Sequence, residues 1–243
     1  MERTFNFEEG EVLLIDKPLG WTSHDLVNKV KKVVCRHSKV PFRKMKVGHA
    51  GTLDPLASGL MIVLTGKKTK QQDQFMGMPK TYTGTFTLGG STASYDLEKT
   101  VDTNYPIQHI TEEMIHHAAA SFLGFSEQTP PVFSAKKIDG ERAYHMARKG
   151  EVVDIKKIEI EITQFEITAI RMPKVDFLIT CSKGTYIRSL ARDFGLLLQS
   201  GAYLSALRRT KIGDFCIEDA LFVEALEKQL GVENPRLHQA KKP

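Results

Sequence analysis

The alternation of apolar and polar positions predicts several elements in the first part of the chain. An apolar run at 12–15 predicts a short strand, and Thr22-Ser23-His24-Asp25 after it has the form of a capping box, a signal for a helix start. The helix that follows carries apolar residues at helical spacing: Leu26, Val27, Val30, Val33 and Val34. A second apolar run at 60–64 predicts a buried strand, and 81–88 alternates with the period of two of a half-buried strand.

The second half of the chain mixes both kinds of element. Residues 111–123 have a helical apolar face with Gly124 just beyond it, strand patterning dominates 152–181, and a helix follows Lys183-Gly184. A last helix is expected over 218–230. Because strands and helices do not alternate regularly as βαβ units, the predicted fold class is α+β, with a mixed, mostly antiparallel central sheet flanked by helices.

Length and composition indicate a globular protein. The 243 residues suffice for one large domain or two small ones, and we expect one domain over 1–232 with a disordered polar tail at 233–243. The N-terminal residues do not have the pattern of a targeting signal, in which a basic segment precedes an apolar one. No apolar run approaches the roughly 18 residues of a membrane span. The 3 cysteines form neither a disulfide framework nor a zinc pattern. These features predict a reduced, cytoplasmic protein without metal or membrane attachment.

The clustering of basic residues changes this picture more than the net charge of +5 does. From residue 29 to residue 46 the chain has no acid and eight basic residues: Lys29, Lys31, Lys32, Arg36, Lys39, Arg43, Lys44 and Lys46. A second basic excursion, 128–150, interrupts the strand pattern. Two such clusters indicate a polyanionic partner such as nucleic acid.

One carboxylate stands out as a candidate for chemistry. Asp54 lies in the glycine-flanked sequence Gly48 to Gly59, five residues after His49 and without a second acid nearby. A hydrolase of a glycosidic bond usually needs two carboxyl groups, so a lone acid favours covalent chemistry on a polyanion. The alternative is structural: Asp54 caps a helix and Pro55 is its first residue.

A second candidate site follows the strand that ends at Cys181. Arg188 falls in the first turn of the predicted helix, where the helix dipole disfavours positive charge. A carboxylate partner resolves this conflict, and we hypothesise that Arg188 holds Asp54; the alternative is a solvated surface arginine. Tyr82, on the strand 81–88, either packs on a sheet face or offers a surface on which a base stacks.

Two further features are ambiguous on the residues alone. His49 is either a structural histidine or part of a site, and its neighbours do not have metal-ligand spacing. The cluster Leu207-Arg208-Arg209 with Lys211 is either a solvated face or a set of phosphate contacts.

Taken together, these features match a known family. The motifs that carry the match, in chain order, are Leu14-Ile15-Asp16-Lys17-Pro18 with Gly20, Val47 to Gly59, Lys80-Thr81-Tyr82, Ser134-Ala135-Lys136, and Cys181 to Arg188 with Leu207-Arg208-Arg209. The chain resembles the TruB-type tRNA pseudouridine synthases from about residue 11 to residue 230. The resemblance implies the pseudouridine synthase fold, in a short bacterial form without the C-terminal PUA domain of many members.

The resemblance also implies a reaction and roles for residues. The family isomerises uridine 55 in the T arm of tRNA to pseudouridine by base flipping, without a cofactor, and we expect a monomer. Asp54 would be the nucleophile, paired with Arg188, and would attack either the ribose C1′ or the uracil ring. The remaining roles concern the flipped base and its surroundings: stacking (Tyr82), pocket walls (Tyr186 and Leu207), filling of the vacated space (His49) and support of the loop (Lys17).

The family pattern further implies RNA contacts. The excursion 128–150 matches an insertion that clamps the T arm. Basic residues in and beyond it suit the RNA backbone: Lys136, Lys137, Arg142, Arg208 and Arg209. The family often has Thr-x-Thr-x-Asp where this chain has Thr92-Ala93-Ser94-Tyr95-Asp96, so Ser94 and Tyr95 are departures.

Two other function classes compete with the enzyme. The first is a module that remodels tRNA and whose catalysis is vestigial, and the second is a relative that modifies another RNA. The set of Asp54, Tyr82 and Arg188 favours the enzyme over the module, because a protein that only remodels RNA does not need the carboxylate.

Overall fold

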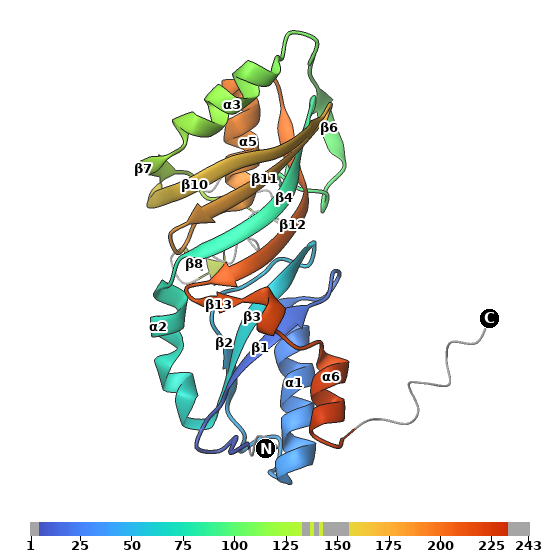
Figure 1. Ribbon diagram of the computed structural model, residues 1–243, viewed down its shortest axis with the longest axis vertical. Helices are drawn as coiled ribbons and strands as arrows, with labels where there is room; N and C mark the ends of the chain where they lie inside the picture. Colours follow the sequence, from blue (N-terminus) through green and yellow to red (C-terminus); the bar gives the residue numbers. More distant parts are fainter. Residues whose placement is uncertain (1–4, 133–136, 139–140, 143–155, 233–243) are drawn as a thin grey trace, which may run out of the picture. The chain divides into compact units, whose positions relative to one another are not determined.

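The computed structural model describes residues 5–132, 137–138, 141–142 and 156–232 (Figure 1). Contacts between residues divide the chain into two compact units. The first unit comprises Met1–Met78 and Arg209–Pro243, and the second comprises Pro79–Arg208. In the part of the chain that is described, no helix combines the length and the apolar composition needed to cross a membrane.

The first unit is built on the antiparallel pair of β1 (Val12–Lys17) and β3 (Ala57–Thr65), in the register Val12 to Leu64 through Lys17 to Gly59. The short β2 (Val47–His49) precedes β3 in the chain and pairs with it in antiparallel orientation. The end of β12 (Ala202–Ile212) follows β3 in the strand order and pairs with β13 (Phe215–Cys216). The helical segments of the first unit are α1 (Ser23–Ser38), η1 (Gly66–Gln71), α2 (Gln72–Gly77), η2 (Ile217–Asp219) and α6 (Val223–Gln229).

The sequence explains why α1 begins and packs as it does. The Thr22 hydroxyl accepts a hydrogen bond from the Asp25 amide, and the Asp25 carboxylate accepts one from the Thr22 amide, so the predicted capping box is confirmed. The apolar stripe of α1 is buried, and so is nearly all of β3. α6 lies beside α1, and Figure 1 shows the two helices together.

The second unit is an antiparallel sheet with helices on one face. Its strand order begins with β12 and continues with β4 (Lys80–Leu88), β11 (Lys174–Cys181), β10 (Ile158–Arg171) and β7 (Gly124–Gln128). The helices are α3 (Glu112–Ser121) and α5 (Ile187–Leu197), and β5 (Gly90–Thr92) pairs with β6 (Val101–Asn104). Phenylalanine rings join the sheet to the helical layer, with neighbouring centroids 4.3–6.4 Å apart: Phe86, Phe122, Phe165, Phe177 and Phe194.

The predicted fold class is confirmed, and most predicted elements are present within a few residues of their expected bounds. The last helix is an exception, because η2 and α6 divide the range 218–230. Leu221 lies between them in an extended bridge to β1, where its amide donates to the Leu14 carbonyl at 2.9 Å. The polar tail expected at 233–243 lies outside the described residues.

The strand β12 is the longest of the elements that the pattern did not predict. Its Arg208-Arg209 pair was interpreted as a surface cluster, yet both residues lie within an 11-residue strand. Gly59 on β3 approaches this strand so closely that a Cβ atom there would lie 2.3 Å from the Arg209 carbonyl oxygen. The contact therefore requires glycine.

We expect Gly59→Ala to lower the free energy of unfolding by about 3 kcal/mol, because it adds this clash to the strain of a φ of +110°. The matched control is Gly20→Ala, which has a φ of +85° but nothing within 4 Å of the new methyl group. This control should lose about 1 kcal/mol. Urea denaturation followed by circular dichroism measures both values, and equal losses would contradict the close approach.

Candidate active site

Asp54 lies in a turn that connects β2 to β3, within the segment 50–56, here called the Asp54 loop. The Ala57 amide donates to the Asp54 carbonyl at 3.1 Å, and β3 begins at Ala57. The interpretation of Asp54 as a helix cap was therefore wrong. Asp and Pro are favoured at the first two positions of a β-turn, and the buried apolar run that follows continues as a strand.

Hydrogen bonds hold the Asp54 loop against the start of α1. The Ser23 hydroxyl donates to the Leu53 carbonyl at 2.9 Å and accepts from the Leu53 amide at 2.8 Å. The Gly20 amide donates to the Pro55 carbonyl at 2.8 Å. The residues on both sides of Asp54 are thus fixed by backbone contacts, which limits the movement of its carboxylate.

Arg209 holds the same loop from the side of β12. Its side chain is 1% exposed, and its guanidinium donates from Nε to the Leu60 carbonyl at 2.8 Å and from a terminal nitrogen to the Gly51 carbonyl at 3.1 Å. These contacts correct the expectation of an RNA-backbone contact, because a buried guanidinium bonded to two carbonyls has no surface to offer a phosphate. They also exclude the solvated-face alternative for this residue.

Lys17 is a second buried cation beneath the loop. Its side chain has 0% exposure, and its Nζ donates to the carbonyls of Pro18 at 3.0 Å and Trp21 at 2.6 Å. Burial lowers the pKa of Lys17 to about 8, while the negative charge of Asp54 opposes this shift and the positive charge of Arg209 adds to it. Lys17 therefore lies within electrostatic range of the candidate nucleophile.

His49 lies on β2 at the entry to the loop. Burial lowers its pKa, and a backbone hydrogen bond to Gly51 only partly opposes that shift, so the imidazole is neutral at pH 7. Its Nδ1 atom is buried without a hydrogen-bond partner in the described part of the chain. His49 thus presents an uncharged ring next to the Asp54 loop.

In the second unit, Arg188 has the carboxylate partner that its place in the helix predicted. It occupies the first turn of α5, and its Nε lies 3.7 Å from Oδ2 of Asp96. Both side chains are 6% exposed. A terminal nitrogen of Arg188 also donates to the Ser94 carbonyl at 3.4 Å. Asp96 was not singled out as a site residue, and the proposed pairing of Arg188 with Asp54 stays a prediction.

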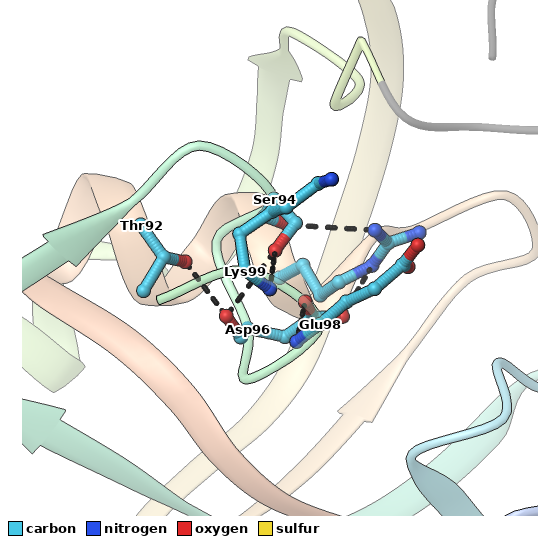
Figure 2. A network of polar contacts seen from close by, with 6 residues as sticks. Thr92, Ser94, Asp96, Glu98 and Lys99 are labelled. Atoms are coloured by element: carbon cyan, nitrogen blue, oxygen red, sulfur yellow. Dashed lines mark hydrogen bonds and ion pairs between the residues drawn. The ribbon is translucent and has the colours of Figure 1, made fainter. Parts of the chain in front are cut away.

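The loop that carries Asp96 is held by its own polar side chains (Figure 2). The hydroxyls of Thr92 and Ser94 donate to the Asp96 carbonyl at 2.7 and 3.2 Å, and the Glu98 amide donates to the Asp96 carboxylate at 3.0 Å. Ser94 therefore keeps the hydroxyl that the family pattern expects from threonine. Tyr95, the other departure, has a φ of 62° and packs its ring 5.0 Å from the Arg192 guanidinium.

The other predicted pocket residues of this unit lie on three elements. Tyr82 is on β4 and 8% exposed. Tyr186 precedes α5, and the Gln128 side-chain amide accepts from its amide at 2.8 Å and donates to its carbonyl at 3.1 Å. Leu207 and Arg208 are half-buried on β12. Gln128, which fixes the backbone of Tyr186, was not predicted, because no motif or spacing marks it.

The basic excursion 128–150 lies largely outside the described residues. Lys136 is among those not described. The strand pair β8 (Lys137–Ile138) and β9 (Glu141–Arg142) aligns Lys137 with Arg142, although their side chains are not described. Their contacts to an RNA backbone remain a prediction.

Comparisons with known proteins identify the family of the chain. Residues 39–187 match the model of the TruB family pseudouridylate synthase N-terminal domain, and residues 188–238 match that of the tRNA pseudouridylate synthase B C-terminal domain. Relatives named tRNA pseudouridine synthase B come from Phocaeicola vulgatus, at 52% identity over 93% of this chain and 95% of the relative, and from Flavobacterium johnsoniae, at 51% over 91% and 96%. The chain therefore belongs to the TruB family of pseudouridylate synthases, and the resemblance is confirmed.

Solved structures share the fold. A chain of a Cbf5–Nop10–Gar1 complex superposes with a TM-score of 0.67 at 27% identity, over 93% of this chain and 58% of that chain. A chain of an H/ACA RNP bound to a substrate RNA containing 2′-deoxyuridine gives a TM-score of 0.65 at 26% identity, over 94% and 57%. The chain thus spans little more than half the length of these solved chains.

The variant Lys17→Met tests the buried cation. Between the folded-state pKa of about 8 and the ordinary value of 10.5, the unfolded chain keeps a proton that the folded chain has released. The cost of burying Lys17 is therefore greatest below pH 8 and falls as the pH rises. From pH 7.0 to 9.5, the wild type should gain about 2 kcal/mol of unfolding free energy relative to Lys17→Met. Urea titrations at both pH values check this, and a pH-independent difference would contradict it.

The variant Asp96→Asn tests the buried ion pair. It removes the negative charge beside the Arg188 guanidinium, so the free energy of unfolding should fall by about 2 kcal/mol. The matched control is Glu127→Gln, because the Lys157–Glu127 pair at 3.3 Å is 62% and 70% exposed and should contribute very little. Thermal and urea denaturation measure both variants. The same small loss for each would show that the buried pair carries no special weight.

Proposed function

We propose that this protein converts uridine 55 in the T arm of tRNA to pseudouridine, with Asp54 as the nucleophile. The observation that carries the proposal is a single carboxylate on a loop fixed from both sides, by Ser23 and by Arg209. The relatives' name, tRNA pseudouridine synthase B, supports tRNA as the substrate. A binding module would not need a carboxylate on a loop whose backbone is held in this way.

The reaction rearranges bonds without net gain or loss of atoms. The bond between C1′ of the ribose and N1 of uracil breaks, the base turns, and a bond forms between C1′ and C5. The proton leaves C5, and N1 gains one. A carboxylate nucleophile divides such an exchange into two easier steps, whether it attacks C1′ or the ring, and a second acid to activate water is not required.

The surrounding residues have the properties that base flipping needs. Extrusion of a stacked base costs a few kcal/mol, and stacking on an aromatic ring such as that of Tyr82 returns about 1–3 kcal/mol. His49 fills the vacated space with a ring that carries no charge at pH 7. Arg188 pairs with Asp54, and Asp96 with Ser94 sets the position of Arg188. Tyr186 and Leu207 line the pocket, which keeps water from the detached sugar.

The remaining assignments belong to the same proposal. Lys17 supports the Asp54 loop through the carbonyls of Pro18 and Trp21. Arg208, Lys136, Lys137 and Arg142 contact the RNA backbone. The protein acts as a monomer and needs no cofactor, because the isomerisation transfers neither electrons nor groups to another molecule.

Tritium release from a tRNA transcript labelled at C5 of uracil tests the proposal. The wild type should release about one equivalent per tRNA, mapped to position 55, because C5 exchanges its proton for the new bond. Asp54→Asn should lower the rate at least about 10³-fold and retain binding. The control substrate is the same transcript with cytidine at position 55.

Three results would contradict this proposal. Tritium release by Asp54→Asn at the wild-type rate would exclude Asp54 as the nucleophile. Tight binding by the wild type without release would favour an RNA-binding module. Release from an unrelated hairpin but not from an isolated T-arm stem-loop would indicate that the substrate is another RNA.

A further inference from the structure

The face of α1 and the segment that follows it form an exposed basic surface in the first unit. Its exposed cations, here called the α1 basic surface, are Lys32, Arg36, Lys39, Arg43, Lys44 and Lys46. No acid occurs in the chain from residue 29 to residue 46. The proposed reaction and the pocket residues named above use none of these cations.

Acidic residues of the fold neutralise little of this charge. The buried Glu227 on α6 lies 2.7 Å from Lys29, and 4.0 Å from the half-exposed Arg36. Asp25 is engaged in the capping box with Thr22. Within the described residues, no carboxylate pairs with Lys32, Lys39, Arg43, Lys44 or Lys46. Most of the α1 basic surface is therefore available to an anionic partner.

The helix geometry aligns the surface into a track. Residues four apart lie on one face of a helix, so Asn28, Lys32 and Arg36 form a row opposite the buried apolar stripe. The 16 residues of α1 extend over about 24 Å. Lys31 of α1 places its ammonium 4.2 Å from the ring centroid of Phe42, which follows the helix and is 43% exposed. One aromatic ring thus lies among the cations, and rings among cations are typical of single-strand nucleic-acid binding surfaces.

A pocket lies at the end of the track nearest the Asp54 loop. It has a volume of about 290 Å³ and is lined by Trp21, Asp25, Asn28, Lys29 and Lys32. The backbone beside it is shared with the candidate site, because the Trp21 carbonyl accepts from Lys17 and the Gly20 amide bonds to Pro55. The indole ring of Trp21, the amide of Asn28 and the ammonium group of Lys32 suit an unstacked nucleotide, through stacking, base-edge contact and phosphate contact respectively.

We propose that the α1 basic surface binds the phosphate backbone of the tRNA, and that the pocket at Trp21 receives one unstacked nucleotide outside the reacting uridine. The choice of tRNA as the polyanion rests on the proposed function. Charge complementarity favours RNA, because lysine and arginine at regular intervals match a chain of phosphates. The indole beside the Asn28 amide favours a nucleotide over a lipid headgroup, because a base offers both a flat ring and a hydrogen-bonding edge.

The first test is the salt dependence of binding. Lys32→Gln/Arg36→Gln removes two charges from the track, and Glu227 keeps Lys29 as its partner. The matched control, Lys67→Gln/Lys70→Gln, removes two exposed charges from η1 in the same unit. For full-length tRNA, the track variant should bind about tenfold more weakly at 100 mM salt, and its plot of log K against log salt should be shallower by about 1–2. The control should match the wild type within twofold.

The second test uses the only tryptophan of the chain, Trp21. Its fluorescence should change when tRNA is added to Asp54→Asn, which cannot turn over, and Lys32→Gln/Arg36→Gln should shift that titration to tenfold higher RNA. Should this double variant unfold, Arg43→Gln/Lys44→Gln outside the helix replaces it.

Several outcomes would overturn the inference. Equal affinities and salt slopes for track and control variants would exclude phosphate contacts on α1. An unchanged Trp21 signal at saturating tRNA would leave the pocket without a nucleotide. If Lys32→Gln/Arg36→Gln no longer floats with anionic phospholipid vesicles as the wild type does, while its tRNA affinity is unchanged, the surface binds a membrane. Absence of tritium release would refute the proposed function, while the binding measurements would still decide whether the track holds RNA.

Discussion

The buried guanidinium of Arg209 is the contact on which the geometry of the first unit depends. A buried cation is costly unless hydrogen bonds replace its hydration, and Arg209 obtains them from the carbonyls of Leu60 and Gly51. Those carbonyls belong to the strand and the loop on either side of Asp54, so the side chain of one strand sets the path of another segment. The glycine at position 59 permits the two strands to approach closely enough for this.

Lys17 is the other buried cation near the Asp54 loop, and hydrogen bonds to carbonyls replace its hydration as well. Its ammonium is bonded to two carbonyls, yet its pKa falls to about 8, because the nearby Arg209 charge adds to the desolvation while Asp54 offsets only part of it. A neutral amine still donates two hydrogen bonds, so the contacts with Pro18 and Trp21 persist when the proton is lost. Two buried cations near the Asp54 loop therefore combine hydrogen bonds to backbone carbonyls with a local positive potential.

The sequence predicted local features well and long-range ones poorly. The capping box at Thr22 and Asp25 and the apolar period of α1 depend on neighbouring residues, so their patterns were sufficient. The turn at Asp54-Pro55 was misread because Asp-Pro begins helices and turns alike, and only the strand after it decides between them. Arg209 looked like a surface cation because burial depends on contacts with residues distant in the chain, at Gly51 and Leu60. The need of Arg188 for a carboxylate followed from the helix dipole, but its identity as Asp96 did not.

The segment from Lys17 to Trp21 connects the two parts of the first unit that we propose to contact RNA. The Gly20 amide donates to the Pro55 carbonyl of the Asp54 loop, and Trp21 forms a wall of the pocket at the start of the α1 basic surface. A nucleotide that stacks on Trp21 therefore contacts a residue whose carbonyl is bonded to the cation beneath Asp54. On this proposal, binding energy gained along α1 acts next to the reacting base rather than at a remote site. Such placement lets contacts that do not take part in the chemistry orient the substrate for it.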